Sequence, residues 1–222
     1  MDTPASGGLR DLAPALSALP LFPLNTVLFP GALLPLHIFE PRYRTMVREV
    51  LDTHRALAVV FVTDPSSVDA HGHPALARIA GAGVIVDHVE LPSGRFNIIV
   101  RGRARVALDE LPFGDRPYRT ARAEVISPPA SEVSAADLST LVAAAAAFTA
   151  RVRERDPSFD FSLPRDAPAG VVADLCAHHL VLDARERQTA LETLEVGPRV
   201  RRVADALALQ RLALSHDPRE MN

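Results

Sequence analysis

The sequence has 222 residues and a net charge of −3, and all 24 of its basic side chains are arginine. Because it contains no lysine, it carries no P-loop of the GxxxxGK(S/T) type, no Ser-Lys dyad and no Schiff-base lysine. Residues 1–127 balance 13 arginines with 13 acids, whereas residues 128–222 hold 11 arginines against 14 acids. Neither half is the basic surface that nucleic-acid binding usually needs, and only 5% of residues are aromatic.

Two features favour a cytoplasmic protein with no membrane partner. Cys176 is the only cysteine, which excludes an internal disulfide and fits a reducing compartment. Residues 12–39 carry no formal charge and are long enough to suggest a membrane span. However, prolines interrupt this run every few residues and prevent a continuous helix. Asp2 and Asp11 also do not fit the positive start of a signal peptide.

The first residues are expected to build short apolar strands and one helix. Residues 1–18, rich in Ala, Gly, Ser and Pro, predict a flexible leader. Two strands are predicted at Leu19–Leu24 and Leu33–Phe39, joined through a Phe29-Pro30-Gly31 turn. Pro41 is placed to begin a helix. Apolar residues then follow at helical spacing: Tyr43, Met46, Val47, Val50 and Leu51.

The next segment reads as a β-rich unit. Ala56–Thr63 is a continuous apolar run, which predicts a strand buried on both faces, and Asp64–Pro74 predicts a polar loop. From Phe96 to Leu108, small or apolar residues occupy every second position, with Ile99 as an exception. Gly102 within this strand indicates a bulge or bend that helps to close a small barrel. Further strands are predicted at Val84–Glu90 and Tyr118–Ile126.

The pattern changes to helical after Ser127-Pro128-Pro129. Ser134-x-x-Asp137 is a capping box that begins a long alanine-rich helix. Further helices are predicted near Gly170–Leu182, at Ala184–Leu194 and after Gly197-Pro198. The expected fold class is therefore α+β: a β-rich pseudo-barrel over residues 19–127, followed by a helical bundle over residues 128–222.

No group of residues meets the standard of a catalytic, cofactor or metal site. His71-x-His73 could supply two metal ligands, but it lies in a Gly/Pro loop without a third ligand, which favours a solvated loop. Cys176 and His179, at i and i+3 on a helix, could form a thiolate–imidazole pair, yet both lie on the core-facing stripe. Gly81-x-Gly83 lacks the third glycine and the following helix of a dinucleotide site.

Three arginines alternate along the longest predicted strand, so that one face should carry them all. This stripe of Arg101, Arg103 and Arg105 has two interpretations. It is either a site for an anion or an acidic peptide, or a solvated face with carboxylate partners on neighbouring strands.

Several motifs, met in order, resemble the N-terminal (substrate-binding) domain of the Lon protease family. In the first part they are Pro20-Leu21-Phe22-Pro23-Leu24, Phe29-Pro30-Gly31, Pro35-Leu36, Glu40-x-Arg42-Tyr43, Gly81-x-Gly83-Val84 and Arg101-Gly102-Arg103-Ala104-Arg105. In the helical part they are Glu186-Arg187-Gln188-x-x-Leu191-Glu192-x-Leu194 and Arg199-x-x-Arg202-Val203. The resemblance covers about residues 19–214 and rests on the combination of motifs.

The resemblance implies a PUA-like pseudo-barrel, a helical bundle and the recognition of unfolded or tagged proteins. In full-length Lon this region precedes an ATPase and a Ser-Lys peptidase. Since the lysines of both are absent, we expect a stand-alone, non-catalytic recognition module without cofactors. Its expected partners are unfolded or partly folded polypeptide, or a separate ATPase or protease that it serves as an adaptor.

The resemblance also suggests which residues contact a peptide, either in an apolar groove or by strand addition at an edge. These residues are Phe29, Pro30, Gly31, Glu40, Arg42, Tyr43, Arg103 and Arg105. The competing interpretation is structural, with Phe22, Leu24, Leu36 and Phe39 in the barrel core and Glu40 paired with Arg105. Two alternative functions are RNA binding, because the β-rich part resembles PUA-like folds, and an enzyme built around Cys176.

Overall fold

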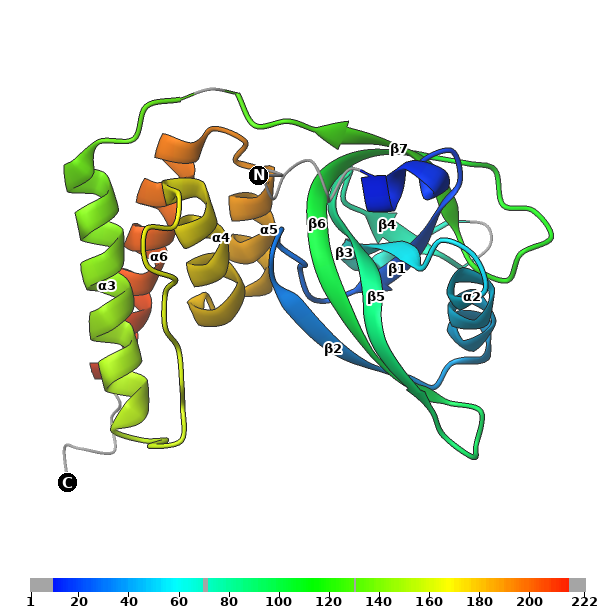
Figure 1. Cartoon of the computed structure of the whole chain (residues 1–222), viewed down its shortest axis with the longest axis horizontal. Coiled ribbons are helices and arrows are strands. Elements are labelled where there is room, and N and C mark those ends of the chain that lie inside the picture. The colour runs from blue at the N-terminus through cyan, green and yellow to red at the C-terminus, as the bar shows by residue number, and fades with distance from the viewer. Residues whose placement is uncertain (1–9, 70–71, 130, 216–222) are drawn as a thin grey trace. The chain divides into compact units, whose positions relative to one another are not determined.

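The computed structural model describes residues 10–69, 72–129 and 131–215. The chain divides into two compact units, Met1–Ser127 and Pro128–Asn222. The described part of the first unit holds helical residues 10–12, which lead into a short 3-10 helix at Ala13–Ala15, together with a longer α-helix and seven strands (Figure 1). The α-helix is α2 (Pro41–Leu51), and the strands are β1 (Leu19–Leu24), β2 (Leu33–Ile38), β3 (Ala56–Val68), β4 (Pro74–Leu76), β5 (Ile79–Glu90), β6 (Phe96–Glu110) and β7 (Thr120–Ile126).

Five strands of the first unit close into a barrel. β1 pairs with β3 in parallel and with β7 in antiparallel, and the circuit continues from β7 to β6, β5 and back to β3. A barrel of so few strands has a narrow interior, which small side chains fill best. The interior is accordingly rich in alanine: Ala56, Ala58, Ala80, Ala82, Ala121 and Ala123. The predicted pseudo-barrel is confirmed.

A second core lies between the outside of the barrel and helix α2. The apolar stripe of α2, including Met46 and Val47, packs there with Leu57 and Val59 of β3. The neighbouring residues Ala56, Ala58 and Val60 point into the barrel instead. β3 is therefore buried on both faces, as its continuous apolar run predicts.

Glycines let a loop cross the barrel wall at close range. A Cβ on Gly81 would lie 1.8 Å from the Leu28 carbonyl oxygen, and one on Gly102 would lie 2.0 Å from that of Phe29. These residues are therefore needed for backbone packing. The register between β5 and β6 also shifts beside Gly102, where Arg103 is the extra residue of a bulge.

Three local predictions for the first unit are wrong. β3 continues to Val68 and pairs with β4, so much of the expected loop at Asp64–Pro74 is strand. Phe39 lies beyond the end of β2 and is 59% exposed, so it is not barrel core. Within the expected leader 1–18, Leu12 and Ala15 are buried with the barrel interior, and residues 1–9 lie outside the described part.

The second unit is a helical bundle, as predicted. Its helices are α3 (Ala135–Arg153), α4 (Ala169–Leu180), α5 (Ala184–Glu192) and α6 (Val196–Ser215). The Ser134 hydroxyl accepts a 3.0 Å hydrogen bond from the Asp137 amide, so Ser134 is the predicted N-cap, while the Asp137 carboxylate pairs with Arg201. In its interior, Arg199 forms a 2.9 Å ion pair with Asp174 of α4 and donates to the carbonyl of Thr193, just after α5.

Helix α3 is the one helix in the described residues that is long and apolar enough to cross a membrane. Core helices of soluble proteins pass the same test, and Leu141, Ala145 and Phe148 of α3 are buried within the bundle. Length and composition are thus a weak indication of a membrane span here.

Candidate functional site

The Phe29-Pro30-Gly31 turn is held against the barrel wall. The Phe29 side chain is fully buried, Pro30 is half-buried and Gly31, at φ +83°, is exposed. The Gly31 amide donates to the Gly102 carbonyl at 3.0 Å, and the Gly102 amide donates to the carbonyl of Ala32 at 2.9 Å. The aromatic ring of this turn is therefore part of the core.

The three arginines of the predicted stripe do not lie on one exposed face of the strand. Arg105 is only 3% exposed, and its guanidinium lies over the Phe29 ring at 5.8 Å from the centroid. Arg103 forms a 2.9 Å ion pair with Asp11, whereas Arg101 is exposed. The bulge at Arg103 shifts the alternation of side chains, which is why the three arginines diverge. This removes the main basic feature that could have favoured RNA or another anion.

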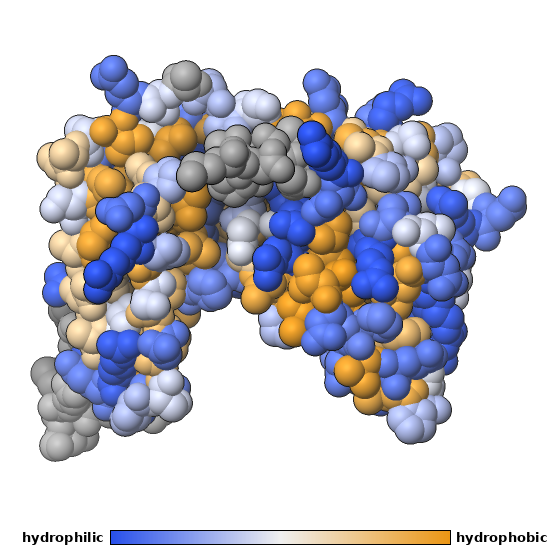
Figure 2. All heavy atoms as spheres, in the orientation of Figure 1, coloured by the Kyte–Doolittle hydropathy of each residue, from blue (hydrophilic) through white to orange (hydrophobic). Residues whose placement is uncertain are grey.

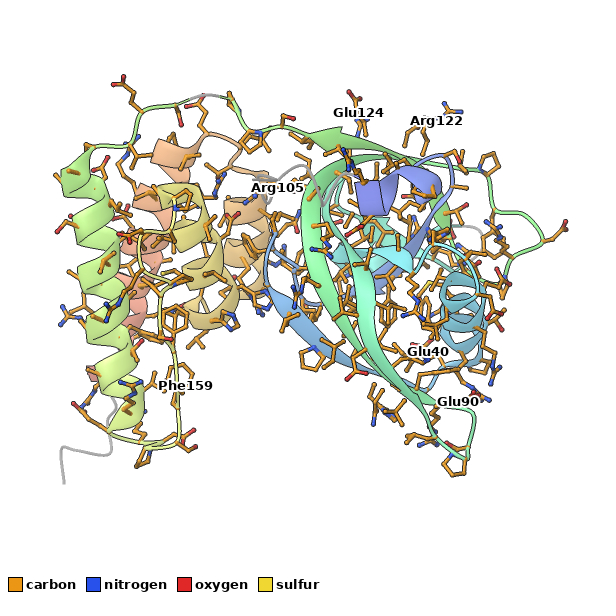
Figure 3. The ribbon with its side chains drawn as sticks, in the orientation of Figure 1. Glu40, Glu90, Arg105, Arg122, Glu124 and Phe159 are labelled. Carbon is orange, nitrogen blue, oxygen red and sulfur yellow. The ribbon has the colours of Figure 1, made fainter. Side chains whose placement is uncertain are left out.

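Glu40, Arg42 and Tyr43 form a second, separate group at the start of α2. Glu40 pairs with Arg42 at 2.9 Å, and Arg42 covers the Tyr43 ring at 4.7 Å. The Tyr43 ring is buried against Phe22, and this burial raises the pKa of its hydroxyl. Figure 3 shows Glu40 well away from Arg105, so the expected Glu40–Arg105 pair is not formed.

A shallow trough lies elsewhere on the first unit, over strands β2, β5 and β6. It has a volume of about 460 Å³. The lining residues are Pro35, Leu36, His37, Asp87, His88, Val89, Asn97, Ile98 and Ile99. We call it the β2–β5–β6 trough.

Large apolar side chains are exposed in and around this trough. Val89 lines it and is 56% exposed, and Val86, the residue at a register shift of β5, is 40% exposed. Phe39, just beyond β2, is exposed too. Figure 2 shows hydrophobic side chains on this face of the first unit, with hydrophilic ones between them. Monomeric proteins rarely expose large continuous apolar patches unless they bind something there.

Four of the nine residues that line the trough are polar: His37, Asp87, His88 and Asn97. His37 Nδ1 lies 2.7 Å from Asn97 Oδ1, across the register pair that joins β2 to β6. The His37 ring also stacks on Phe39 with 6.2 Å between centroids. An apolar ligand that covered this pair would leave the hydrogen bond between His37 and Asn97 in place.

Helix α2 holds the β5–β6 hairpin that forms one end of the trough. Arg44 Nε donates to the Gly94 carbonyl at 2.6 Å, and Arg48 Nη2 donates to Glu90 Oε1 at 2.9 Å. The cation of Arg48 also lies over the Phe96 ring at 5.4 Å. These contacts fix the turn between the strands that carry Val89 and Asn97.

None of the residues that line the trough is among those expected from the sequence to bind a peptide. The sequence nevertheless contains a signal for the trough. Ile99 departs from the alternation of its strand by placing an apolar side chain on the outward row. Pro35 does the same on β2, where it is directly opposite Ile99. Two outward apolar residues on different strands become one surface only when the register is known.

The other candidates for chemistry do not assemble into a site. Cys176 is buried, and burial raises the pKa of its thiol to about 12, which leaves little thiolate at neutral pH. His73 packs against Phe113 with 4.7 Å between ring centroids, and His71 lies outside the described residues. Across the described ranges, no three His, Cys, Asp or Glu side chains are grouped to hold a metal ion.

Comparison with known proteins places this fold in a family. The model of the ATP-dependent protease La (LON) substrate-binding domain matches residues 18–208. The chain is 33% identical over 202 residues to a Lon protease of Roseiflexus castenholzii, covering 89% of this chain and 25% of that protein. It is 30% identical over 192 residues to Lon protease 1 of Thermus thermophilus, covering 83% of this chain and 24% of that protein. The chain thus spans about a quarter of these relatives.

Two solved structures show the same fold. One is a Lon N-terminal domain protein from Xanthomonas campestris, with a TM-score of 0.59, 23% identity and coverage of 88% of this chain and 97% of that one. The other is the N-terminal domain of a Mycobacterium avium complex Lon protease, with a TM-score of 0.62, 14% identity and coverage of 86% and 98%. From the family match over residues 18–208, the chain belongs to the LON substrate-binding domain family.

Proposed function

We propose that this chain is a substrate-recognition module that captures apolar segments of unfolded or partly folded polypeptides in the β2–β5–β6 trough. The substrate-binding description of the family supports the general role. The observation that carries the specific proposal is that Pro35, Ile99 and the 56%-exposed Val89, from three neighbouring strands, line one trough. An unfolded chain presents the apolar side chains that such a surface would cover.

The energetics fit weak and reversible capture. Fully burying one aliphatic or aromatic side chain contributes about 1.5–3 kcal/mol. A shallow trough covers only a few such side chains in part, and ordering a flexible ligand costs free energy as well. We therefore infer micromolar or weaker binding by one copy, which suits a module that must release its substrate.

The captured polypeptide would then pass to a separate ATPase or protease, for which this chain acts as an adaptor. The proposal needs no chemistry from the chain itself. Cys176, the single cysteine, is buried as a free thiol, which supports a cytoplasmic setting for this role.

Amide exchange of the whole chain, with and without a reduced and carboxymethylated unfolded protein, tests the proposal. We expect slower exchange in β2, in the second half of β5 and in the first half of β6. Val89→Asp should weaken this protection at least several-fold, because it replaces an exposed apolar side chain of the trough with a charged one. Val142→Asp is the matched control, since Val142 is an exposed valine of α3 in the other unit.

The exchange pattern separates the possible outcomes. If the unfolded protein changes no amide in these strands, or if both valine variants behave alike, the trough is not the binding surface. The same experiment with a single-stranded RNA addresses the RNA alternative. Phosphate contacts would make the effect fall steeply with salt.

A further inference from the structure

Among the strands that the structure describes, β2 pairs with β6 alone, and a proline occupies its middle. β2 pairs with β6 in the register Leu34 with Val100, Pro35 with Ile99 and Leu36 with Ile98. Successive residues of an antiparallel strand direct their N–H and C=O groups alternately toward the partner and away from it. Because proline has no N–H, the ladder can accept Pro35 only where its nitrogen points away from β6.

With Pro35 at the middle of β2, the edge that faces away from β6 lacks its central backbone N–H donor. Residues two positions apart share a direction, so the next outward-directed donor after Pro35 is the His37 amide. A strand that added to this edge would leave one of its carbonyl groups opposite the proline ring. Sheet edges that carry a central proline are protected against strand pairing in this way.

Pro35 also contributes to the face of the sheet. Its side chain is exposed and lines the trough together with Ile99 and Val89. The residue therefore presents apolar surface to a ligand on the face while it withholds a main-chain donor at the edge.

We infer that the trough recognises its ligands through apolar side chains lying on the sheet face, and that strand addition to β2 is blocked by Pro35. This inference rests on the function proposed above and defines the class of ligand. Such a site would accept apolar segments whatever main-chain donors they offer, including segments interrupted by proline.

Fluorescence anisotropy with three peptides tests the inference. The parent is a short labelled peptide of alternating leucine and serine, and the two others carry N-methyl groups on its odd or on its even residues. Strand addition uses donors on one of these two sets only, and each lost hydrogen bond would weaken binding about two- to ten-fold. For the wild-type chain we expect all three dissociation constants to agree within about two-fold.

The Pro35→Val variant restores the missing donor and provides the second readout. We expect it to prefer the parent over one of the methylated peptides by about two- to ten-fold. Pro112→Val, an exposed proline in the loop between β6 and β7, should not discriminate.

The outcomes distinguish this inference from the proposed function. If the wild-type chain binds one methylated peptide at least ten-fold more weakly than the parent peptide, it binds by strand addition. That result overturns the inference and leaves the recognition role intact. A Pro35→Val variant that does not discriminate shows that Pro35 is not the block. A parent peptide that binds nowhere, together with unchanged amide exchange toward the unfolded protein, overturns both.

Discussion

At the scale of single residues, burial decides what each titratable group can do. Cys176 is kept as a neutral thiol by burial, which raises its pKa. Burial likewise raises the pKa of the Tyr43 hydroxyl, although the nearby Arg42 guanidinium acts in the opposite direction. His54, which follows the end of α2, shows the effect of burial on protonation more clearly, because its hydrogen bond requires the neutral ring. Its Nδ1 accepts from the Ala56 amide at 3.0 Å, so a proton on this nitrogen would remove the acceptor.

We therefore predict that His54 makes the first unit less stable in mild acid. Burial, with a smaller contribution from Arg116, lowers the pKa of His54 below its ordinary value near 6.5. The unfolded chain then binds the proton more readily than the folded chain, so the unfolding free energy falls as the pH drops below about 6.5. His54→Asn keeps an acceptor near the Ala56 amide without titrating, and should reduce the slope of stability against pH. Urea unfolding at several pH values between neutral and mildly acidic measures the unfolding free energy of both proteins. Equal slopes against pH for the wild type and His54→Asn would contradict the prediction.

At the scale of elements, glycine and arginine determine where strands and loops meet. The loop before β2 crosses the barrel wall only because Gly81 and Gly102 offer no side chain. The β5–β6 hairpin keeps its position because Arg44 and Arg48 of α2 hold its turn. The glycines and arginines that make these contacts do not themselves line the trough.

Gly102→Ala should destabilise the first unit by about 1–3 kcal/mol or more, because its Cβ would lie 2.0 Å from the Phe29 carbonyl oxygen and backbone would have to move. Gly114→Ala is the matched control, since no heavy atom lies within 4 Å of its added Cβ. The control should be neutral or stabilising by less than about 1 kcal/mol. Chemical denaturation compares the two variants, and similar unfolding free energies would contradict the packing argument.

At the scale of the whole molecule, the chain is two compact units with different sources of stability. The first unit depends on two apolar cores that share the barrel wall. The second has a charged interior, where Arg199 is 1% exposed, pairs with Asp174 and donates to the Leu194 carbonyl as well. Removing one partner of a buried ion pair leaves an uncompensated charge, which is strongly destabilising.

We predict that Asp174→Asn loosens the helical unit selectively. Loss of the carboxylate charge beside buried Arg199 should cost about 3–5 kcal/mol. Amide exchange should accelerate within residues 131–215 and remain unchanged within the barrel, and peptide binding to the trough should persist. Gly102→Ala should give the reverse pattern. Equal acceleration in both units after either change would show that they unfold together.

The sequence by itself determined the α+β class, the pseudo-barrel, the bundle and the family, because periodicity, capping and ordered motifs are local properties of the chain. The buried face of α2 and the double burial of β3 could be predicted for the same reason. Two local features misled the prediction: Arg105 alternates like an exposed residue, and Phe39 follows an apolar strand. A bulge at Arg103 buries the first, and the end of β2 exposes the second.

Only the tertiary structure decided the location of the candidate site. Pro35, Val89 and Ile99 lie on three different strands, and no single segment shows that they come together. Their proximity depends on the register between β2, β6 and β5, which is set by the bulges and by the loop that crosses at Gly102. A shift of one residue would turn these side chains to the opposite face of the sheet. The trough is therefore a property of strand pairing, which no single segment of the sequence contains.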